Sequence, residues 1–254
     1  SNSKKFKLND KVFVIAKPLG IGNEGGLSEY IMVPENWVEI LPKYLNLKEI
    51  MLIGTAGYTA FKALSKTLKI ILKNKNKPVL VTGACGSVGS FLISILSNLG
   101  VKVEALTSDL KNAKKLKKLG VSNTYQLKKF INTSDFDLLS ERYSVVFDNL
   151  GGDVISGCLK YIVRGGIFIS IGNVIGNISK INILPFILRE VSILGLNTES
   201  LNNKERKLII NNPQFKVLIK KFSKLIKVVE LKQVPAILKL KNYNKNNFRY
   251  VVKI

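Results

Sequence analysis

The chain has 254 residues, a formal net charge of +23, no histidine and two cysteines. An apolar fraction of 46% is enough for a large buried core, and no apolar run reaches the ~18 residues of a membrane-spanning helix, so we predict no membrane partner. Without histidine, and with Cys85 and Cys158 alone, the usual zinc sites cannot form and histidine acid–base catalysis is excluded. Two cysteines give no disulfide framework either, which favours a reducing, cytoplasmic location.

The positive charge points first to nucleic acid as a partner. Lysine, however, supplies 35 of the 40 basic residues, whereas arginine, which suits base edges and bidentate phosphate contacts, supplies five. The lysines at 111–118 are predicted to lie on a solvated helix. We therefore rank nucleic-acid binding below a small-molecule function, although a cationic surface would also attract a polyanionic substrate such as a coenzyme A thioester.

The first part of the chain predicts a β-rich unit followed by a helical region. Alternating apolar residues indicate short strands, which we place at 11–16, 29–33 and 37–40. The pattern then becomes helical over 48–72, and an Asn- and Lys-rich connection at 73–77 leads into the next strand.

Residues 79–90 carry the most informative motif. An apolar strand runs into a turn with glycine at 83, 86 and 89, and an apolar helix is predicted over 91–99. Counted from Ala84 the pattern is A-x-G-x-x-G, the strand–turn–helix signature of dinucleotide binding. Gly86 lets backbone approach a pyrophosphate, Gly89 lets the helix pack against the strand, and the amides that open the helix face the phosphates. Glycines also serve plain tight turns, so the neighbouring elements decide between the two interpretations.

Strands and helices alternate after this turn. We expect strands at 101–106, 145–147 and 166–171, and helices at 111–119 and 153–161, the first of them closed by Gly120. Such alternation forms parallel βαβ units, and strands this apolar are covered on both faces. The sequence therefore predicts an α/β fold with a Rossmann-type, doubly wound parallel sheet.

The tail of the chain predicts further helices and strands. We expect an amphipathic helix at 215–226, a strand at 227–231, a helix at 235–240 and a final strand at 249–254. The final strand is expected to return and pair with the first β segments.

Several segments coincide with one family. They are G-G-L-S-E-Y at 25–30, G-T-A-G-Y-T-A at 54–60, the glycine turn at 82–90, G-G at 165–166, P-F-I-L-R at 185–189 and R-Y-V-V-K at 249–253. With these segments the chain resembles the medium-chain dehydrogenase/reductases. Within them it is similar to the zinc-free acrylyl-CoA reductase and quinone oxidoreductase-like branch, to which the P-F-I-L-R run is the most specific.

The resemblance implies three segments. They are the C-terminal part of a β-rich, GroES-like catalytic domain at 1–47, an NAD(P)-binding Rossmann domain at 48–200, and a return segment at 201–254 that packs with the catalytic domain. The beginning of a family member has no counterpart here, so we expect a fragment of a longer protein. An intact mass of the native protein near 28.2 kDa would contradict this expectation.

The resemblance also implies where a nicotinamide nucleotide binds. Its phosphates would meet the glycine turn, its ribose the end of the following strand, and its nicotinamide the residues further along. The positions implied are Gly83, Cys85, Gly86, Ser87, Val88 and Gly89 in the turn, Thr107, Ser108 and Asp109 on the ribose side, and Asn173, Ile187, Thr198 and Asn244 on the nicotinamide side. Cys85 is expected to contribute its backbone amide rather than act as a thiol nucleophile.

A few charged positions bear on the identity of the coenzyme. The family has Ser-Gly-Arg where this chain has Thr107-Ser108-Asp109, and that arginine pairs with the 2′-phosphate of NADP, which an aspartate would repel. Leu127 stands in place of a second family arginine. Thr107, however, replaces the acid of NAD-binding relatives, and Lys111 and Lys128 can supply positive charge. We favour NADP over NAD.

For four other positions a purely structural role is at least as well supported by the sequence as a role in catalysis or ligand binding. Thr55 and Tyr58 are expected to pack a helix start rather than act in catalysis. Asp148 can equally cap the glycine turn that follows it or contact a ligand. Arg189 is expected to pair with Glu190 or with backbone.

The activity that the resemblance implies is NADPH-dependent reduction of an activated C=C bond, most specifically of acrylyl-CoA to propionyl-CoA by hydride transfer to the β-carbon. No catalytic residue is assigned in this chain, and no metal is expected. A quinone or enone oxidoreductase of the same superfamily is the near alternative, and a non-catalytic nucleic-acid-binding Rossmann protein is the alternative of another class. The family forms homodimers, and an exposed strand at 192–196 is the expected contact.

Overall fold

The computed structural model describes residues 3–131, 136–239 and 249–254. It divides into two compact units, one formed by residues 59–198 and the other by the residues up to 58 together with those from 199 onward. The unit at 59–198 contains the glycine turn.

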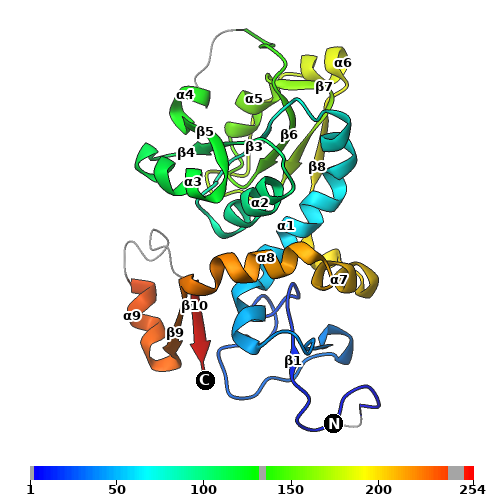
Figure 1. Ribbon diagram of the computed structural model, residues 1–254, viewed down its shortest axis with the longest axis vertical. Coiled ribbons are helices and arrows are strands. Elements are labelled where there is room, and N and C mark those ends of the chain that lie inside the picture. The colour runs from blue at the N-terminus through cyan, green and yellow to red at the C-terminus, as the bar shows by residue number, and fades with distance from the viewer. Residues whose placement is uncertain (1–2, 132–135, 240–248) are drawn as a thin grey trace. The chain divides into compact units, whose positions relative to one another are not determined.

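A parallel sheet of six strands forms the centre of the unit at 59–198 (Figure 1). Its strands are β3 (Val79–Val81), β4 (Val103–Thr107), β5 (Val121–Gln126), β6 (Tyr143–Asp148), β7 (Ile162–Ser170) and β8 (Ser192–Gly195), in the spatial order β5-β4-β3-β6-β7-β8. All five pairings are parallel. The chain adds β4 and β5 on one side of β3 and then crosses to add β6, β7 and β8 on the other, which confirms the predicted doubly wound sheet.

Helices cover both faces of this sheet. They are α2 (Ser87–Asn98), α3 (Ala113–Leu119), α4 (Leu127–Ile131), α5 (Val154–Leu159) and α6 (Leu184–Arg189), with the 3-10 turn η2 (Leu110–Asn112) before α3. α2 packs against α3, and α4 packs against α5, as expected for right-handed crossovers that start in opposite directions from β3. Because both faces are covered, every residue of β3 and β6 is buried. The predicted cap is also confirmed, since α3 ends at Gly120 with φ of 109°.

Strand β4 of this sheet carries a buried acidic residue, Glu104, whose side chain is 2% exposed. Arg142 lies 2.7 Å from its carboxylate, the Tyr143 hydroxyl donates to it at 2.9 Å, and the Asn123 amide donates at 3.1 Å. Burial alone would raise the pKa of Glu104, but these three hydrogen bonds outweigh burial and lower the pKa below its ordinary value. The ionised carboxylate therefore links β4, β5 and the start of β6.

We expect Glu104→Gln to lower the free energy of unfolding at pH 7 by about 1–3 kcal/mol, because it leaves buried donors facing a neutral group. The folded-state pKa of Glu104 lies below that of the unfolded chain, so its stabilisation is present above about pH 4 and is lost as the pH falls through the folded-state pKa. Urea unfolding at pH 7 and pH 3 measures this. The gap between wild type and variant should shrink at low pH, the exposed control Glu35→Gln should show no gap, and a gap that stays constant with pH would contradict the assignment.

The other unit contains two small sheets. β1 (Val12–Phe13) pairs antiparallel with β2 (Glu39–Ile40), and β9 (Ile226–Glu230) pairs in parallel with β10 (Arg249–Lys253). The prediction that the final strand pairs with the first β segments is therefore wrong. Strand β9 lies closer to β10 in the chain, and the two strands pair without a register shift from Arg249↔Ile226 to Lys253↔Glu230.

The α-helices that lie wholly within this unit are in the C-terminal part of the chain, where the sequence predicts helices. They are α7 (Asn203–Ile210), α8 (Pro213–Phe222) and α9 (Val234–Lys239), with 3-10 turns η1 (Glu35–Trp37), η4 (Ser223–Leu225) and η5 (Leu231–Gln233), and a further turn η3 (Thr198–Ser200) lies where the chain enters the unit. The predicted helix at 215–226 therefore begins earlier and ends as η4. The predicted strand at 29–33 is wrong, because the exposed residues there form no ladder with any described strand, and an isolated extended segment has no backbone partners to hold it.

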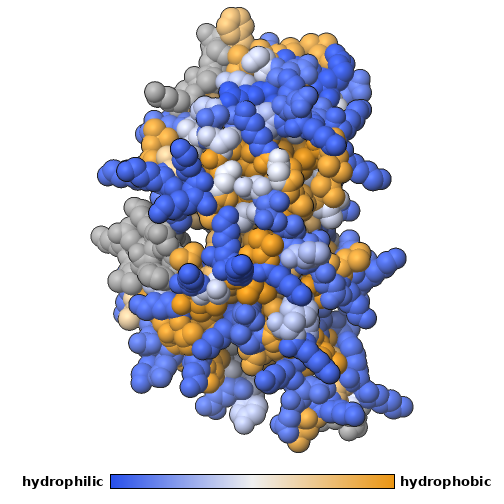
Figure 2. Space-filling view, viewed as in Figure 1, coloured by the Kyte–Doolittle hydropathy of each residue, from blue (hydrophilic) through white to orange (hydrophobic). Residues whose placement is uncertain are grey.

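Helix α1 (Leu47–Lys73) matches the helical region expected at 48–72, except that Gly54 breaks it with a non-helical backbone of φ 50°. None of the helices in the described residues has the length and apolarity to cross a membrane. The face in Figure 2 carries many long hydrophilic side chains, with apolar areas scattered between them.

Candidate coenzyme site

The turn between β3 and α2 has the geometry of a phosphate-binding loop. Gly83 has φ of 56°, and the Gly86 amide donates to the Gly83 carbonyl at 2.9 Å, which closes the turn directly before the first residue of α2. A Cβ atom at Gly89 would lie 2.6 Å from that carbonyl oxygen and 2.9 Å from the Ala84 Cα, so only glycine allows the helix to approach so closely. The amides at the start of α2 have no partners within the helix and present its positive end.

This turn lies where the winding of the sheet reverses. β3 and β6 are neighbours, and the chain departs from them in opposite directions, so a crevice is expected at their carboxyl ends. The interpretation as a plain tight turn explains the backbone conformation at Gly83 but not this position in the sheet. The structure therefore fits a dinucleotide, since the close approach at Gly89 keeps the opening amides of α2 clear of side chains.

Hydrogen bonds fix the ends of β3 and β6 relative to each other. The Thr82 hydroxyl donates to the buried Asp148 carboxylate at 2.5 Å, and the Asn149 side-chain amide donates to the Thr82 carbonyl at 2.8 Å. Asp148 also accepts from the Gly151 amide at 2.8 Å and from the Leu150 amide at 3.2 Å. Burial raises the pKa of Asp148, and these hydrogen bonds oppose that shift. Asp148 caps the following turn, as one of its two interpretations predicted.

The end of β4 brings the predicted ribose-side residues next to the turn. The buried Thr107 hydroxyl donates to the Asp109 carbonyl at 3.1 Å, and the Asp109 carboxylate accepts from the Lys111 amide at 2.9 Å. Burial raises the pKa of the Cys85 thiol, whereas a hydrogen bond with Thr107 and the charge of Lys115 oppose that shift. A thiol whose ionisation is opposed by burial fits a structural Cys85 better than a nucleophile.

The nicotinamide-side predictions are less closely grouped. Asn173 follows β7 at the same carboxyl edge, and its amide donates to the Asn177 side chain at 2.5 Å. Ile187 lies in α6 with 63% of its surface exposed, and the buried Thr198 hydroxyl lies 2.7 Å from the Thr59 hydroxyl. Asn244 lies outside the described residues. The roles of all four in coenzyme binding stay predictions.

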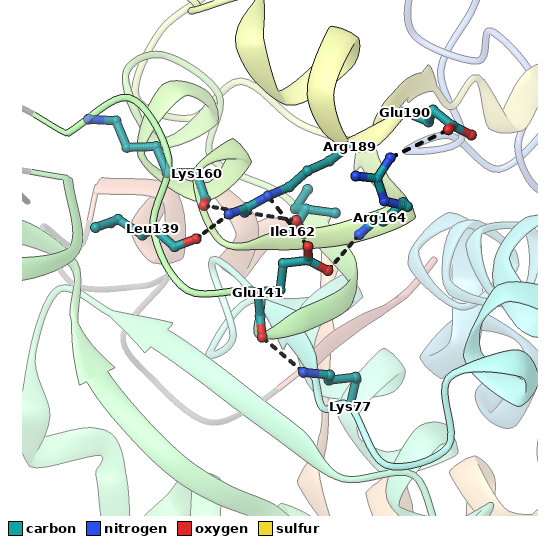
Figure 3. Close-up of polar contacts among 8 residues, drawn as sticks. All are labelled: Lys77, Leu139, Glu141, Lys160, Ile162, Arg164, Arg189 and Glu190. Atoms are coloured by element: carbon teal, nitrogen blue, oxygen red, sulfur yellow. Dashed lines mark hydrogen bonds and ion pairs between the residues drawn. The ribbon is translucent and has the colours of Figure 1, made fainter.

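The P-F-I-L-R run lies in α6, and the side chain of its arginine is held beside the start of β7 (Figure 3). Arg189 donates to the carbonyls of Leu139 at 2.5 Å and Lys160 at 2.9 Å, and it lies 3.7 Å from Glu141. The expected backbone contacts are confirmed. Of the two expected alternatives the structure shows the backbone one, and Glu190, at the end of α6, lies 3.6 Å from Arg164 instead.

The family described as zinc-binding dehydrogenase matches residues 87–211. Among curated proteins, the putative quinone oxidoreductase YhfP of Bacillus subtilis is 35% identical and the acrylyl-CoA reductase AcuI of Ruegeria pomeroyi 32% identical, each over 198 residues that make up 78% of this chain and 60% of the relative. Among solved structures, B. subtilis YhfP with NAD bound has a TM-score of 0.88 at 31% identity, covering 100% of this chain and 78% of that one.

This chain belongs to the medium-chain dehydrogenase/reductase superfamily. Within the superfamily it groups with the zinc-free quinone oxidoreductases and acrylyl-CoA reductases. A further relative, the yhdH oxidoreductase of Salmonella enterica in complex with NADP, has a TM-score of 0.87 at 25% identity and covers 100% of this chain and 78% of that one. The aligned part of the chain spans about 60% of the length of the curated relatives.

Sequence reasoning missed two features of the site. The side chains of Thr82 and Asn149 join β3 to β6, and the charge of Lys115 acts on the Cys85 thiol of the glycine turn. Polar residues at the ends of adjacent strands were a usable signal for the first feature. The second had none, because five lysines between 111 and 118 look alike in the sequence.

Proposed function

We propose that this chain is part of an NADPH-dependent reductase of activated C=C bonds, with acrylyl-CoA as the favoured substrate. The observation that carries the proposal is the glycine turn at the reversal point of the sheet, where Gly89 allows α2 to begin against the end of β3. Relatives named as an acrylyl-CoA reductase and a quinone oxidoreductase support the reaction class.

In this proposal the chain binds and orients the coenzyme. The backbone amides of residues 85–88 hold the diphosphate, and the positive end of α2 adds favourable electrostatics. Thr107, Ser108 and Asp109 meet the adenosine ribose, while Asn173, Ile187, Thr198 and Asn244 line the nicotinamide side. A bound nicotinamide nucleotide supplies the hydride, and the protein around it supplies position and excludes water.

Coenzyme titration of the full-length chain tests the first step of the proposal. NADPH and NADH binding, followed by the change in nucleotide fluorescence, should both saturate, with NADPH the tighter ligand. Tighter binding of NADH would contradict the preference for NADP. Failure of both nucleotides to bind a correctly folded sample would overturn the oxidoreductase assignment itself.

A substrate panel tests the second step. The complete gene product should oxidise NADPH with acrylyl-CoA faster than with small quinones, and no oxidation with acrylyl-CoA would eliminate this substrate. Higher turnover of quinones would favour the general quinone or enone oxidoreductase, for which the relation to YhfP is the specific support. Sub-micromolar nucleic-acid affinity that falls steeply with salt would favour the non-catalytic alternative.

We further propose that β8 mediates a homodimer. It is the last strand on its edge of the sheet, and all four of its residues are exposed, which leaves one row of backbone groups available for pairing. Light scattering should report twice the chain mass for the wild type and the single mass for Ile193→Lys.

A further inference from the structure

Charged groups of both signs gather on the adenosine side of the candidate site. Because β3 and β4 are paired in parallel from Val79↔Val103 to Val81↔Ala105, the segments that follow them lie side by side. The Thr107 hydroxyl accordingly reaches the Cys85 thiol, and the charges of Asp109 and Lys115 both act on that thiol. Two opposite charges therefore stand within electrostatic range of the phosphate turn.

The Asp109 carboxylate has a local structural role. One of its oxygens accepts from the Lys111 amide at 2.9 Å and caps η2, so its position is set by the backbone. Its negative charge remains next to the predicted ribose-side residues. A 2′-phosphate bound there would be repelled unless a cation offsets Asp109.

Lys115 differs from the other lysines of α3. Lys114, Lys117 and Lys118 are exposed, whereas Lys115 is half-buried directly before the fully buried Leu116. Its half-burial beside Leu116 places it at the margin of the packed face of α3, and its charge favours the ionised form of the Cys85 thiol. α3 also packs on α2, the helix that the turn opens.

We propose that Lys115 is the residue that selects a coenzyme carrying a 2′-phosphate, by offsetting Asp109 and attracting the phosphate to the end of β4. The proposal rests on the proposed function and names the specificity determinant of the same site. Lys115 is preferred to Lys111 and Lys128, because both of those lysines are exposed.

Binding measurements on full-length variants test the proposal without relying on turnover. Lys115→Ala should weaken NADPH binding about ten- to a hundredfold, the loss expected for one charge-assisted contact to phosphate, and should change NADH binding by less than about threefold. Lys115→Arg should retain the preference. The matched control is Lys118→Ala, which removes one exposed lysine from the same helix and should leave both affinities unchanged.

Two further measurements separate the 2′-phosphate from the diphosphate. 2′,5′-ADP should lose affinity for Lys115→Ala, whereas 5′-AMP should not. Asp109→Asn, which keeps the cap of η2, should tighten NADPH binding because it removes a like charge.

Equal losses for NADPH and NADH, or no loss for either, would overturn the role of Lys115 while leaving the coenzyme site intact. If neither nucleotide binds the wild type, the proposed function fails instead.

Discussion

Replacing Gly86 with valine is expected to weaken the binding of NADPH and NADH about a hundredfold while the protein still folds. Gly86 has φ of −71° and ψ of 172° directly before α2, a conformation that valine adopts readily, and a Cβ there would lie 3.2 Å from the Gly83 carbonyl oxygen. The side chain would stand beside the amides that open the helix. Two charge-assisted hydrogen bonds lost from the diphosphate correspond to about 3 kcal/mol.

The measurement is nucleotide titration by fluorescence, with circular dichroism and Tm as controls for folding. Gly26→Val is a matched variant, because a Cβ at Gly26 would meet no atom within 4 Å and its backbone does not need glycine. It should bind both coenzymes as the wild type does. Wild-type affinity in a well-folded Gly86→Val sample would show that the turn has no role in binding.

The largest effect on stability is expected from Glu39→Gln in the unit formed by the two ends of the chain. The Arg206 side chain is 1% exposed and donates from Nε to the Glu39 carboxylate at 2.6 Å and from Nη2 to the Ile15 carbonyl at 2.6 Å. It also lies over the ring of the buried Tyr58, with 5.0 Å from Cζ to the ring centroid. Without the carboxylate a buried guanidinium loses its counter-charge, which costs about 3–5 kcal/mol of unfolding free energy.

A double variant separates loss of charge from loss of packing. Glu39→Gln with Arg206→Met removes both charges and should recover most of the stability, because replacing a buried ion pair with apolar groups is often neutral. Urea unfolding of the two single variants and the double variant completes the cycle. The exposed pair of Arg164 and Glu190 provides the control, and Arg164→Gln should change stability by less than about 0.5 kcal/mol. A Glu39→Gln protein as stable as this control would disprove the assignment.

Thr55 and Tyr58 show how a structural interpretation can be right when the sequence offers a catalytic one. The Ala16 amide donates to the Thr55 hydroxyl at 3.3 Å, and the Tyr58 ring is fully buried and meets Phe215 edge to face. Burial is the main reason that the pKa of the Tyr58 hydroxyl lies well above its usual value. Burial therefore opposes ionisation of this phenol.

The sequence by itself determined the glycine turn, the alternating strands and helices around it, and the end of α3 at Gly120. Each of these depends on residues close together in the chain: apolar period, propensity and the few positions where only glycine fits. These local patterns can therefore be interpreted from the sequence alone.

Tertiary structure alone decided the partners. It paired β10 with β9, left residues 29–33 without a ladder, placed Arg189 beside Glu141, and brought the charge of Lys115 to act on the Cys85 thiol. A strand becomes a strand only when another backbone satisfies its hydrogen bonds, and a charge finds its partner through the packing of distant segments. The local sequence pattern predicts neither the strand partners nor the charge partners, because many lysines and many short apolar runs in this chain have similar sequence surroundings. Only their positions in the folded structure distinguish them.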